Sequence, residues 1–293
     1  MSAQLLVSLV QTNLYWEDKA ANLAMLEEKL ASIGKAEVVV LPEMFSTGFS
    51  MQPKRLAETM DGPTLQWMKS IAARHKIILT GSLIIAEEGN YFNRLIWMQP
   101  NGHLGYYDKR HLFGYAGENQ HYTAGSKRLI ASAKGFKINL QICYDLRFPV
   151  WARQQPQPHA QPEYDVLMYV ANWPQRRVQA WQTLLQARAM ENQCYVVGVN
   201  RVGNDGNGIY HNGHSMVVDA LGNVLFDRAD DECIHTVALS LDALAELRKQ
   251  LPFAEQNNVA EAFEIAVEFA FIGPPAARDG EGGQQLAVQA GLH

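Results

Sequence analysis

The sequence FKINLQICYDLRFP, residues 136–149, predicts a β-strand that ends at a cysteine. Apolar residues at 136, 138, 140 and 142 alternate with polar ones, which is the period of a half-buried strand. Cys143 follows at once, before a polar Tyr-Asp-Leu-Arg segment, where a sheet commonly presents a side chain to a cleft. Cys143 is either a small core residue, the commoner role of a cysteine, or a nucleophile.

Helices and strands alternate on both sides of this stretch. The expected elements are a helix over 23–33, a strand over 36–45, a helix from 63, a strand over 77–85, two β runs around a turn at 100–102, a strand over 164–174, a helix over 178–189, a strand over 194–202 and a hairpin over 214–226. The strands are rich in valine and isoleucine. This order predicts one α/β layered domain whose sheets are covered by helices.

Composition limits the class of protein. A net charge of −5 over 293 residues gives no overall basic excess for a nucleic acid partner. The N-terminus lacks the pattern of a signal peptide, and no apolar run is long enough to cross a membrane, so we expect a cytoplasmic protein without a membrane partner. The three cysteines are widely spaced, which argues against both a disulfide framework and a structural metal site.

A nucleophilic cysteine needs a base and a cation, and three other residues are candidates. Glu43 follows the apolar strand of VVVLPEMF, where it is either a solvated carboxylate or a rigidly presented one. Lys109 in YYDKRHLF ends a β run, although most lysines are surface groups. Glu118 lies in a glycine-bracketed loop, where a solvated acid is the ordinary alternative. None of these residues decides the matter when taken alone.

Together these residues form a pattern that resembles the nitrilase superfamily of carbon-nitrogen hydrolases. The matching motifs, in chain order, are LPEMF (41–45), YDKRHLF (107–113), AGE (116–118), ICYDLRFP (142–149), ANWP (171–174), ARAMENQCYVVGVNRVG (187–203) and HSMVVDALGNVL (214–225). The resemblance spans residues 4–250 and is greatest to the omega-amidase branch. It implies a four-layer αββα sandwich that pairs into a homodimer through the helices around the cysteine strand.

The resemblance also implies a role for each candidate. Cys143 would be the nucleophile, Glu43 the general base, and Lys109 the cation of an oxyanion hole completed by the backbone N–H of Tyr144. Glu118 would be a second acid that positions either the substrate nitrogen or the lysine. This scheme requires no metal ion and no organic cofactor.

The implied reaction releases ammonia, through a thioester, from the terminal amide of 2-oxo dicarboxylic acid monoamides such as 2-oxoglutaramate and 2-oxosuccinamate. Such a small-molecule substrate has a carboxylate at its far end. Arg147 is a candidate partner for that carboxylate, although a salt bridge to a structural acid is the alternative. Trp173 and Tyr115 are candidates for the pocket wall, although an aromatic residue is more often part of the core.

Other functions remain open at this point. Another amide, an N-carbamoyl compound or a nitrile would use the same four positions, and a non-catalytic scaffold or a redox sensor at Cys143 belongs to a different class. The sequence does not reveal the substrate's chain length or the pathway. We place the hydrolase domain at residues 1–253. Residues 254–293 depart from the branch, so we predict a divergent C-terminal extension whose last part is flexible.

Overall fold

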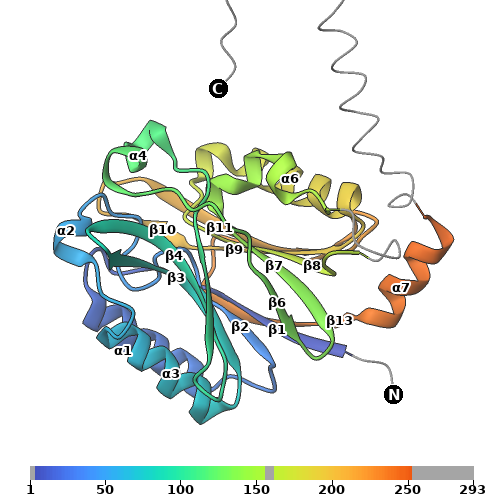
Figure 1. Cartoon of the computed structure of the whole chain (residues 1–293), viewed down its shortest axis with the longest axis horizontal. Coiled ribbons are helices and arrows are strands. Elements are labelled where there is room, and N and C mark those ends of the chain that lie inside the picture. The colour runs from blue at the N-terminus through green and yellow to red at the C-terminus, as the bar shows by residue number, and fades with distance from the viewer. Residues whose placement is uncertain (1–3, 156–161, 253–293) are drawn as a thin grey trace, which may run out of the picture. The chain divides into compact units, whose positions relative to one another are not determined.

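The computed structural model describes residues 4–155 and 162–252, which form two β-sheets stacked face to face between layers of helices (Figure 1). The predicted C-terminal extension lies outside the described residues, and the domain boundary before it stays a prediction. None of the helices within the two described ranges is long and apolar enough to cross a membrane.

The first sheet has six strands in the order β13-β1-β2-β3-β4-β5. Its strands are β1 (Gln4–Gln11), β2 (Val38–Val40), β3 (Ile78–Glu87), β4 (Asn90–Met98), β5 (Leu104–Asp108) and β13 (Cys233–Ser240). Strands β1, β2 and β3 are parallel. A two-residue turn joins β3 to β4, and Glu88 and Gly89 both have positive φ there, as the twist of a tight hairpin requires.

The second sheet has the order β10-β11-β9-β8-β7-β6, with β12 paired to β11. Its strands are β6 (Ile130–Ala133), β7 (Phe136–Ile142), β8 (Val166–Ala171), β9 (Tyr195–Asn200), β10 (Val202–Asn204), β11 (Tyr210–Val218) and β12 (Val224–Ala229). Strands β7, β8 and β9 are again parallel. Each sheet therefore has a parallel centre with antiparallel strands at its sides, which suits a sheet covered on both faces.

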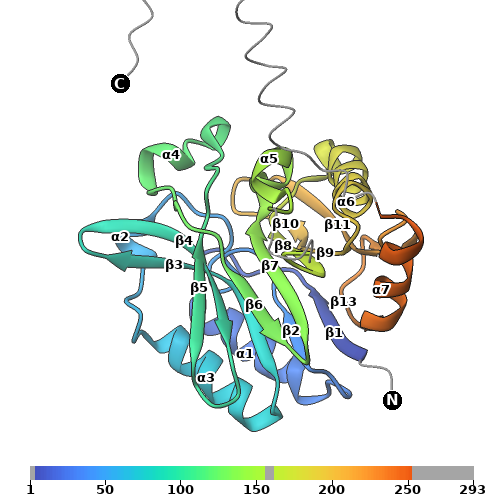
Figure 2. The same cartoon turned by 45° about the vertical axis from the view of Figure 1, so that its right-hand side comes forward.

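Helices form the outer layers. Figures 1 and 2 agree in placing α1 (Lys19–Ala31) and α3 (Pro63–His75) on the first sheet and α6 (Val178–Asn192) on the second. Asp18 begins α1 by accepting a hydrogen bond from the Ala21 N–H, and Pro63 begins α3 at a position where a missing N–H costs nothing. The remaining helices are α2 (Pro53–Leu56), α4 (Glu118–His121), α5 (Pro149–Ala152) and α7 (Leu241–Gln250).

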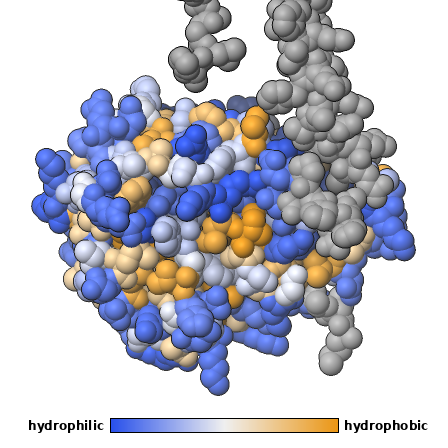
Figure 3. Space-filling view, in the orientation of Figure 1, coloured by the Kyte–Doolittle hydropathy of each residue, from blue (hydrophilic) through white to orange (hydrophobic). Residues whose placement is uncertain are grey.

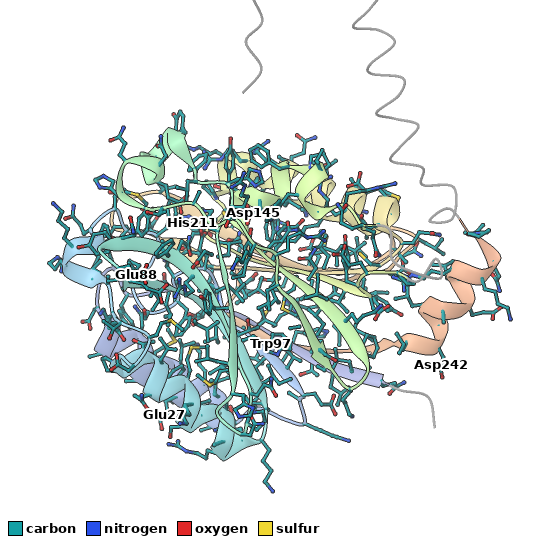
Figure 4. All side chains as sticks on the ribbon, in the orientation of Figure 1. Glu27, Glu88, Trp97, Asp145, His211 and Asp242 are labelled. Atoms are coloured by element: carbon teal, nitrogen blue, oxygen red, sulfur yellow. The ribbon has the colours of Figure 1, made fainter. Side chains whose placement is uncertain are left out.

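The main core lies between the sheets. Val7 and Val40 of the first sheet share one buried cluster with Leu140 and Val166 of the second, and Trp97 points into the same layer (Figure 4). A second cluster lies between the first sheet and helices α1 and α3. On the face in Figure 3, hydrophilic residues surround a central group of hydrophobic ones. These layers agree with the expected αββα sandwich.

One expectation about the deciding strand was wrong. The polar residues Asn139 and Gln141 of β7 are buried, so the strand is covered on both faces and is not half-buried. The reason is the helical layer, because Gln141 lies under α5 and its Nε2 is 3.5 Å from the Trp151 carbonyl oxygen. The alternation of apolar and polar residues along β7 therefore does not show which of its side chains face solvent.

Candidate active site

Three of the four candidate residues come together because each follows the carboxyl end of a strand, and the fourth, Glu118, begins helix α4 in the loop after β5. Glu43 lies shortly after β2, Lys109 directly after β5, and Cys143 directly after β7. Two consecutive antiparallel pairings make β5 run in the same direction as β3 and β2, so their carboxyl ends meet at one edge of the first sheet. Asn172, after β8, brings the second sheet to the same place by donating its backbone N–H to Glu43 Oε2 at 2.8 Å.

The Lys109 ammonium is the centre of this cluster. Its Nζ lies 2.9 Å from Glu43 Oε1 and 2.9 Å from Glu118 Oε2, and all three side chains are completely buried. Asn93 of β4 donates through Nδ2 to both carboxylates, at 2.8 Å to Glu43 and 3.2 Å to Glu118. Glu118 also accepts the Phe113 N–H at 2.5 Å. Buried charges of this kind persist only when they are paired and hydrogen-bonded.

Burial and charge shift the pKa values of the cluster. Burial alone would lower the pKa of Lys109, but the charges of Glu118 and Glu43 outweigh it and raise that pKa, so the lysine is held as a cation. Burial raises the pKa of Glu118, although Lys109 acts in the opposite direction. Burial, followed by the charge of Glu43, raises the pKa of the Cys143 thiol well above its ordinary value. The resting thiol is therefore neutral.

Cys143 occupies a strained turn. Its φ is 45°, in the left-handed region that non-glycine residues seldom adopt, and it is the first residue of the 3₁₀ helix Cys143–Arg147. The Glu43 carboxylate lies close enough to the thiol for its charge to raise the pKa of Cys143. Tyr144 is the next residue, and the N–H groups in the first turn of a helix have no acceptor within that helix. Backbone strain at a cleft, beside a buried carboxylate, is typical of a functional position.

A cavity of about 680 Å³ opens over Cys143, a size that suits a small organic molecule. Tyr144 and the three residues predicted to bind substrate, Tyr115, Arg147 and Trp173, also line it. Trp173 is almost fully buried, whereas Tyr115 is 80% exposed. The Arg147 guanidinium lies 5.1 Å from the centre of the Trp173 ring, and it forms no ion pair with any carboxylate in the described part of the chain.

Glu43, Lys109 and Glu118 lie behind Cys143, beneath the cavity wall, because they are fully buried and are not among the lining residues. The ordinary readings of these residues, a surface lysine and two solvated acids, are therefore wrong. Cys194, before β9, is also buried, and Cys233, at the start of β13, is partly buried; both are free thiols away from the cavity.

Sequence reasoning missed several residues of the site. Asn93 and Asn172 hold the carboxylates, and Arg177 lines the cavity. Asparagine within the apolar run NRLIWM and after the apolar strand YVA is a signal for a buried polar contact, because an unpaired buried amide is costly. Within residues 4–155 and 162–252, no group of three or more histidine, cysteine, aspartate or glutamate side chains could hold a metal ion.

Comparison with known proteins agrees with this geometry. The family model described as carbon-nitrogen hydrolase matches residues 6–249. The chain is similar to a protein named omega-amidase YafV from Yersinia enterocolitica, with 43% identity over 84% of this chain and 94% of the relative. It is also 32% identical to a 2-oxoglutaramate amidase from Bacillus subtilis, over 84% of this chain and 95% of that protein.

Comparison with a solved structure also shows similarity to the carbon-nitrogen hydrolases. Xc1258 from Xanthomonas campestris, a CN-hydrolase superfamily protein with an arsenic adduct in its active site, superposes with a TM-score of 0.85. The two chains are 44% identical, and the match covers 87% of this chain and 97% of Xc1258. The similarity therefore extends through both sheets and through all the strand ends that carry the cluster.

Proposed function

The chain belongs to the carbon-nitrogen hydrolase family of the nitrilase superfamily, and from this premise we propose that it is an omega-amidase that releases ammonia from 2-oxo dicarboxylic acid monoamides. The names of the two relatives, omega-amidase and 2-oxoglutaramate amidase, support this substrate class. The single observation that carries the chemistry is the fully buried Lys109–Glu43 ion pair, 2.9 Å from Nζ to Oε1, beside the Cys143 thiol whose pKa the Glu43 charge raises.

Acylation begins with a neutral thiol. Glu43 takes the thiol proton while Cys143 Sγ forms a bond to the amide carbonyl carbon. Because the thiol pKa is raised, proton removal and bond formation proceed together and do not pass through a stable thiolate. Glu43 then delivers the proton to the nitrogen, the carbon-nitrogen bond breaks, and ammonia leaves a thioester on Cys143.

Deacylation repeats these steps with water. Glu43 removes a proton as water attacks the thioester carbonyl, the carbon-sulfur bond breaks, and the thiol regains a proton as the acid departs. Negative charge collects on the carbonyl oxygen in both steps. Lys109 and the Tyr144 N–H would stabilise that oxyanion. We propose that Glu118 positions the lysine rather than the substrate nitrogen, and the distances of 3.1 and 2.9 Å from its two oxygens to Lys109 Nζ support this role.

Substrate binding involves the cavity residues. Trp173 and Tyr115 would contact the carbon chain of the substrate, and Arg147 would attract its carboxylate. We also propose that the protein acts in the cytoplasm as a homodimer. Val150 on α5 is 83% exposed and Met190 on α6 is 49% exposed, so the helices around the cysteine strand present apolar groups for such a pairing.

The direct test is ammonia release from 2-oxoglutaramate and 2-oxosuccinamate by the wild type and by Cys143→Ala. An N-carbamoyl amino acid and an aliphatic nitrile are assayed beside them. We expect turnover of the oxo-amides that disappears in the variant. Turnover of only another substrate would retain the mechanism and reject the omega-amidase assignment, and turnover of none would favour a scaffold or a sensor. Light scattering of wild type and Val150→Glu tests the dimer, which the variant should weaken.

A further inference from the structure

The cavity holds more positive charge than its own acids neutralise. Four arginines and two acidic residues are among its lining residues. One arginine, Arg55, is paired with Glu17. The second acid, Asp205, accepts the backbone N–H groups of Asn207 and Ile209. Arg147, Arg176 and Arg177 have no carboxylate partner among residues 4–155 and 162–252. The protein as a whole carries a net charge of −5, so this local excess is opposite to its average.

Each of these three guanidinium groups rests on an aromatic ring. Arg147 lies 5.1 Å from the Trp173 ring centre, Arg176 lies 5.9 Å from the Tyr115 ring centre, and Arg177 lies 5.0 Å from the Phe113 ring centre. A ring face orients a guanidinium but does not occupy its N–H donors, which stay in the plane of the group. The three groups are thus held in place with donors available.

Arg177 has the most enclosed position of the three. It is partly buried, whereas Arg147 and Arg176 are exposed. The Trp173 indole N–H donates to the Arg177 carbonyl oxygen at 2.8 Å, which fixes the backbone beside the cavity. Its ring partner Phe113 is in turn fixed by the hydrogen bond from its N–H to Glu118. Arg177 is therefore connected on two sides to residues of the active site.

The position of Arg177 is electrostatically unfavourable in the absence of an anion. Arg177 is the residue that precedes α6, and the helix dipole places partial positive charge at that end. Burial and the charges of Arg176 and Arg147 lower the pKa of Arg177, whereas a charge on Cys143 would raise it. Repulsion among three cations that lack a carboxylate partner in the described ranges, near a helix N-terminus, is relieved when an anion enters the cavity.

We propose that Arg177 determines the specificity of the site by binding, in a bidentate manner, the carboxylate at the far end of the amide substrate, with Arg147 and Arg176 adding to the positive potential. This inference rests on the proposed amidase function. A planar guanidinium matches the two oxygens of a carboxylate, and a partly buried pair gains more than an exposed one. The site then selects anionic monoamides over neutral amides of the same length.

The test compares 2-oxoglutaramate with its neutral methyl ester, with ammonia release as the readout for both. Arg177→Met removes the charge and keeps an apolar stem for Phe113, and Arg177→Lys keeps the charge without the bidentate geometry. The matched control is Arg74→Met, which removes an exposed arginine of α3 that is paired with Glu27 of α1. For Arg177→Met we expect kcat/KM on the anionic amide to fall on the order of 100-fold, mainly through KM, with the neutral ester little changed. For Arg177→Lys we expect kcat/KM on the anionic amide to lie between the values of the wild type and Arg177→Met.

Equal losses on both substrates, or no loss on either, would overturn the proposal. Calorimetric binding of 2-oxoglutarate, the dicarboxylate product, separates this failure from failure of the proposed function. If the wild type turns over neither amide, the proposed function is wrong, and the binding experiment alone decides whether Arg177 binds a carboxylate. Weaker binding by Arg177→Met than by wild type and Arg74→Met then supports the carboxylate site, and equal binding, or no binding by the wild type, rejects it.

Discussion

The Lys109 side chain lies between two buried carboxylates and neutralises one of their two formal charges. Its Nζ contacts Glu43 and Glu118 at 2.9 Å each, with all three groups excluded from solvent. Breaking a buried ion pair by removing one partner is strongly destabilising, because the remaining charges have no compensation. Lys109 therefore contributes to the stability of the fold as well as to the proposed chemistry.

The first prediction separates these two contributions. Lys109→Met should lower the free energy of unfolding by about 3 to 5 kcal/mol, because it leaves Glu43 and Glu118 facing each other without a cation. Adding Glu118→Gln should restore part of that stability, since one of the two charges is gone, while ammonia release stays absent in both variants. Urea unfolding and the ammonia assay measure the two effects. A double variant no more stable than Lys109→Met would show that repulsion between the acids is not the cause.

The second prediction concerns the Cys143 thiol, whose pKa is raised above its ordinary value of 9.0 by burial and by Glu43. A raised pKa keeps the thiol protonated to higher pH, so the rate of alkylation by iodoacetamide should rise only above pH 9. Glu43→Gln removes the negative charge and should shift that rise to lower pH. Mass spectrometry of the Cys143 peptide gives the rate, and Glu27→Gln on α1 is the control. A rise near neutral pH in the wild type would contradict a neutral resting thiol.

The sequence predicted which residues form the site but not their burial or their contacts. The order of the motifs around Glu43, Lys109, Glu118 and Cys143 identified them, because a family pattern is read along the chain. Lys109 and Glu118 are fully buried by contacts between segments that are distant in the sequence. A local sequence pattern does not predict such contacts. Arg177 was missed for the same reason, since its place over Phe113 brings together residues far apart in the chain.

At the scale of elements, Asp145 connects the turn after β7 to the end of β5 and to the loop that follows β5. It accepts the Ile142 N–H at 3.0 Å within its own turn, the Tyr107 hydroxyl at 2.7 Å and the His111 N–H at 2.9 Å. Tyr107 and His111 flank Lys109 by two residues on either side. The Asp145 carboxylate thus sets the position of the lysine segment relative to the cysteine turn.

The third prediction tests this link with Tyr107→Phe. The Tyr107 hydroxyl accepts the Arg110 N–H at 3.1 Å and the Trp151 indole N–H at 3.0 Å, so its loss leaves these two donors without this acceptor and takes a donor from the buried Asp145 carboxylate. We expect a loss of about 1 to 3 kcal/mol in stability, and a larger fall in kcat than rise in KM, because the Lys109 segment is no longer held. The neighbouring Tyr106→Phe, at a 45% exposed residue, is the control. Unchanged kcat in a destabilised Tyr107→Phe would make the link purely structural.

The elements themselves were predictable wherever apolar periodicity was strong. The helix over 178–189 and the strand over 194–202 correspond to α6 (Val178–Asn192) and to β9 with β10. The exposure of β7 was not predictable, because the polar residues Asn139 and Gln141 are covered by other layers of the sandwich. Residue type predicts which side of a strand faces water only when one side does face water.

At the scale of the whole molecule, the two sheets share one core and should unfold together. Leu140 of β7 is completely buried in the cluster that also contains Val7 and Val40 of the first sheet. A layer of side chains that belongs to both sheets couples their stabilities, since neither sheet can keep its inner face covered alone.

The fourth prediction follows from that coupling. Leu140→Ala should cost about 2 to 5 kcal/mol through lost packing and a residual cavity. Native-state hydrogen exchange should then lose protection in β1 and β2 as well as in β7 and β8. The control is Leu225→Ala, at a residue of β12 that is 46% exposed. Loss of protection confined to the second sheet would mean that the sheets unfold separately.

The arginines around the cavity that have no carboxylate partner in the described part of the chain should also affect how a substrate arrives. A negatively charged protein with a positive opening has an uneven external field, which draws small anions toward that opening before any contact forms. Dissolved salt shortens the reach of such a field to about 8 Å at physiological ionic strength. The capture of an anionic amide should therefore slow as salt is added. Turnover of the bound substrate should stay constant, because the residues proposed to carry it, Cys143, Glu43 and Lys109, are buried. The cell's ionic composition would then set the rate of capture and leave the chemistry unaffected.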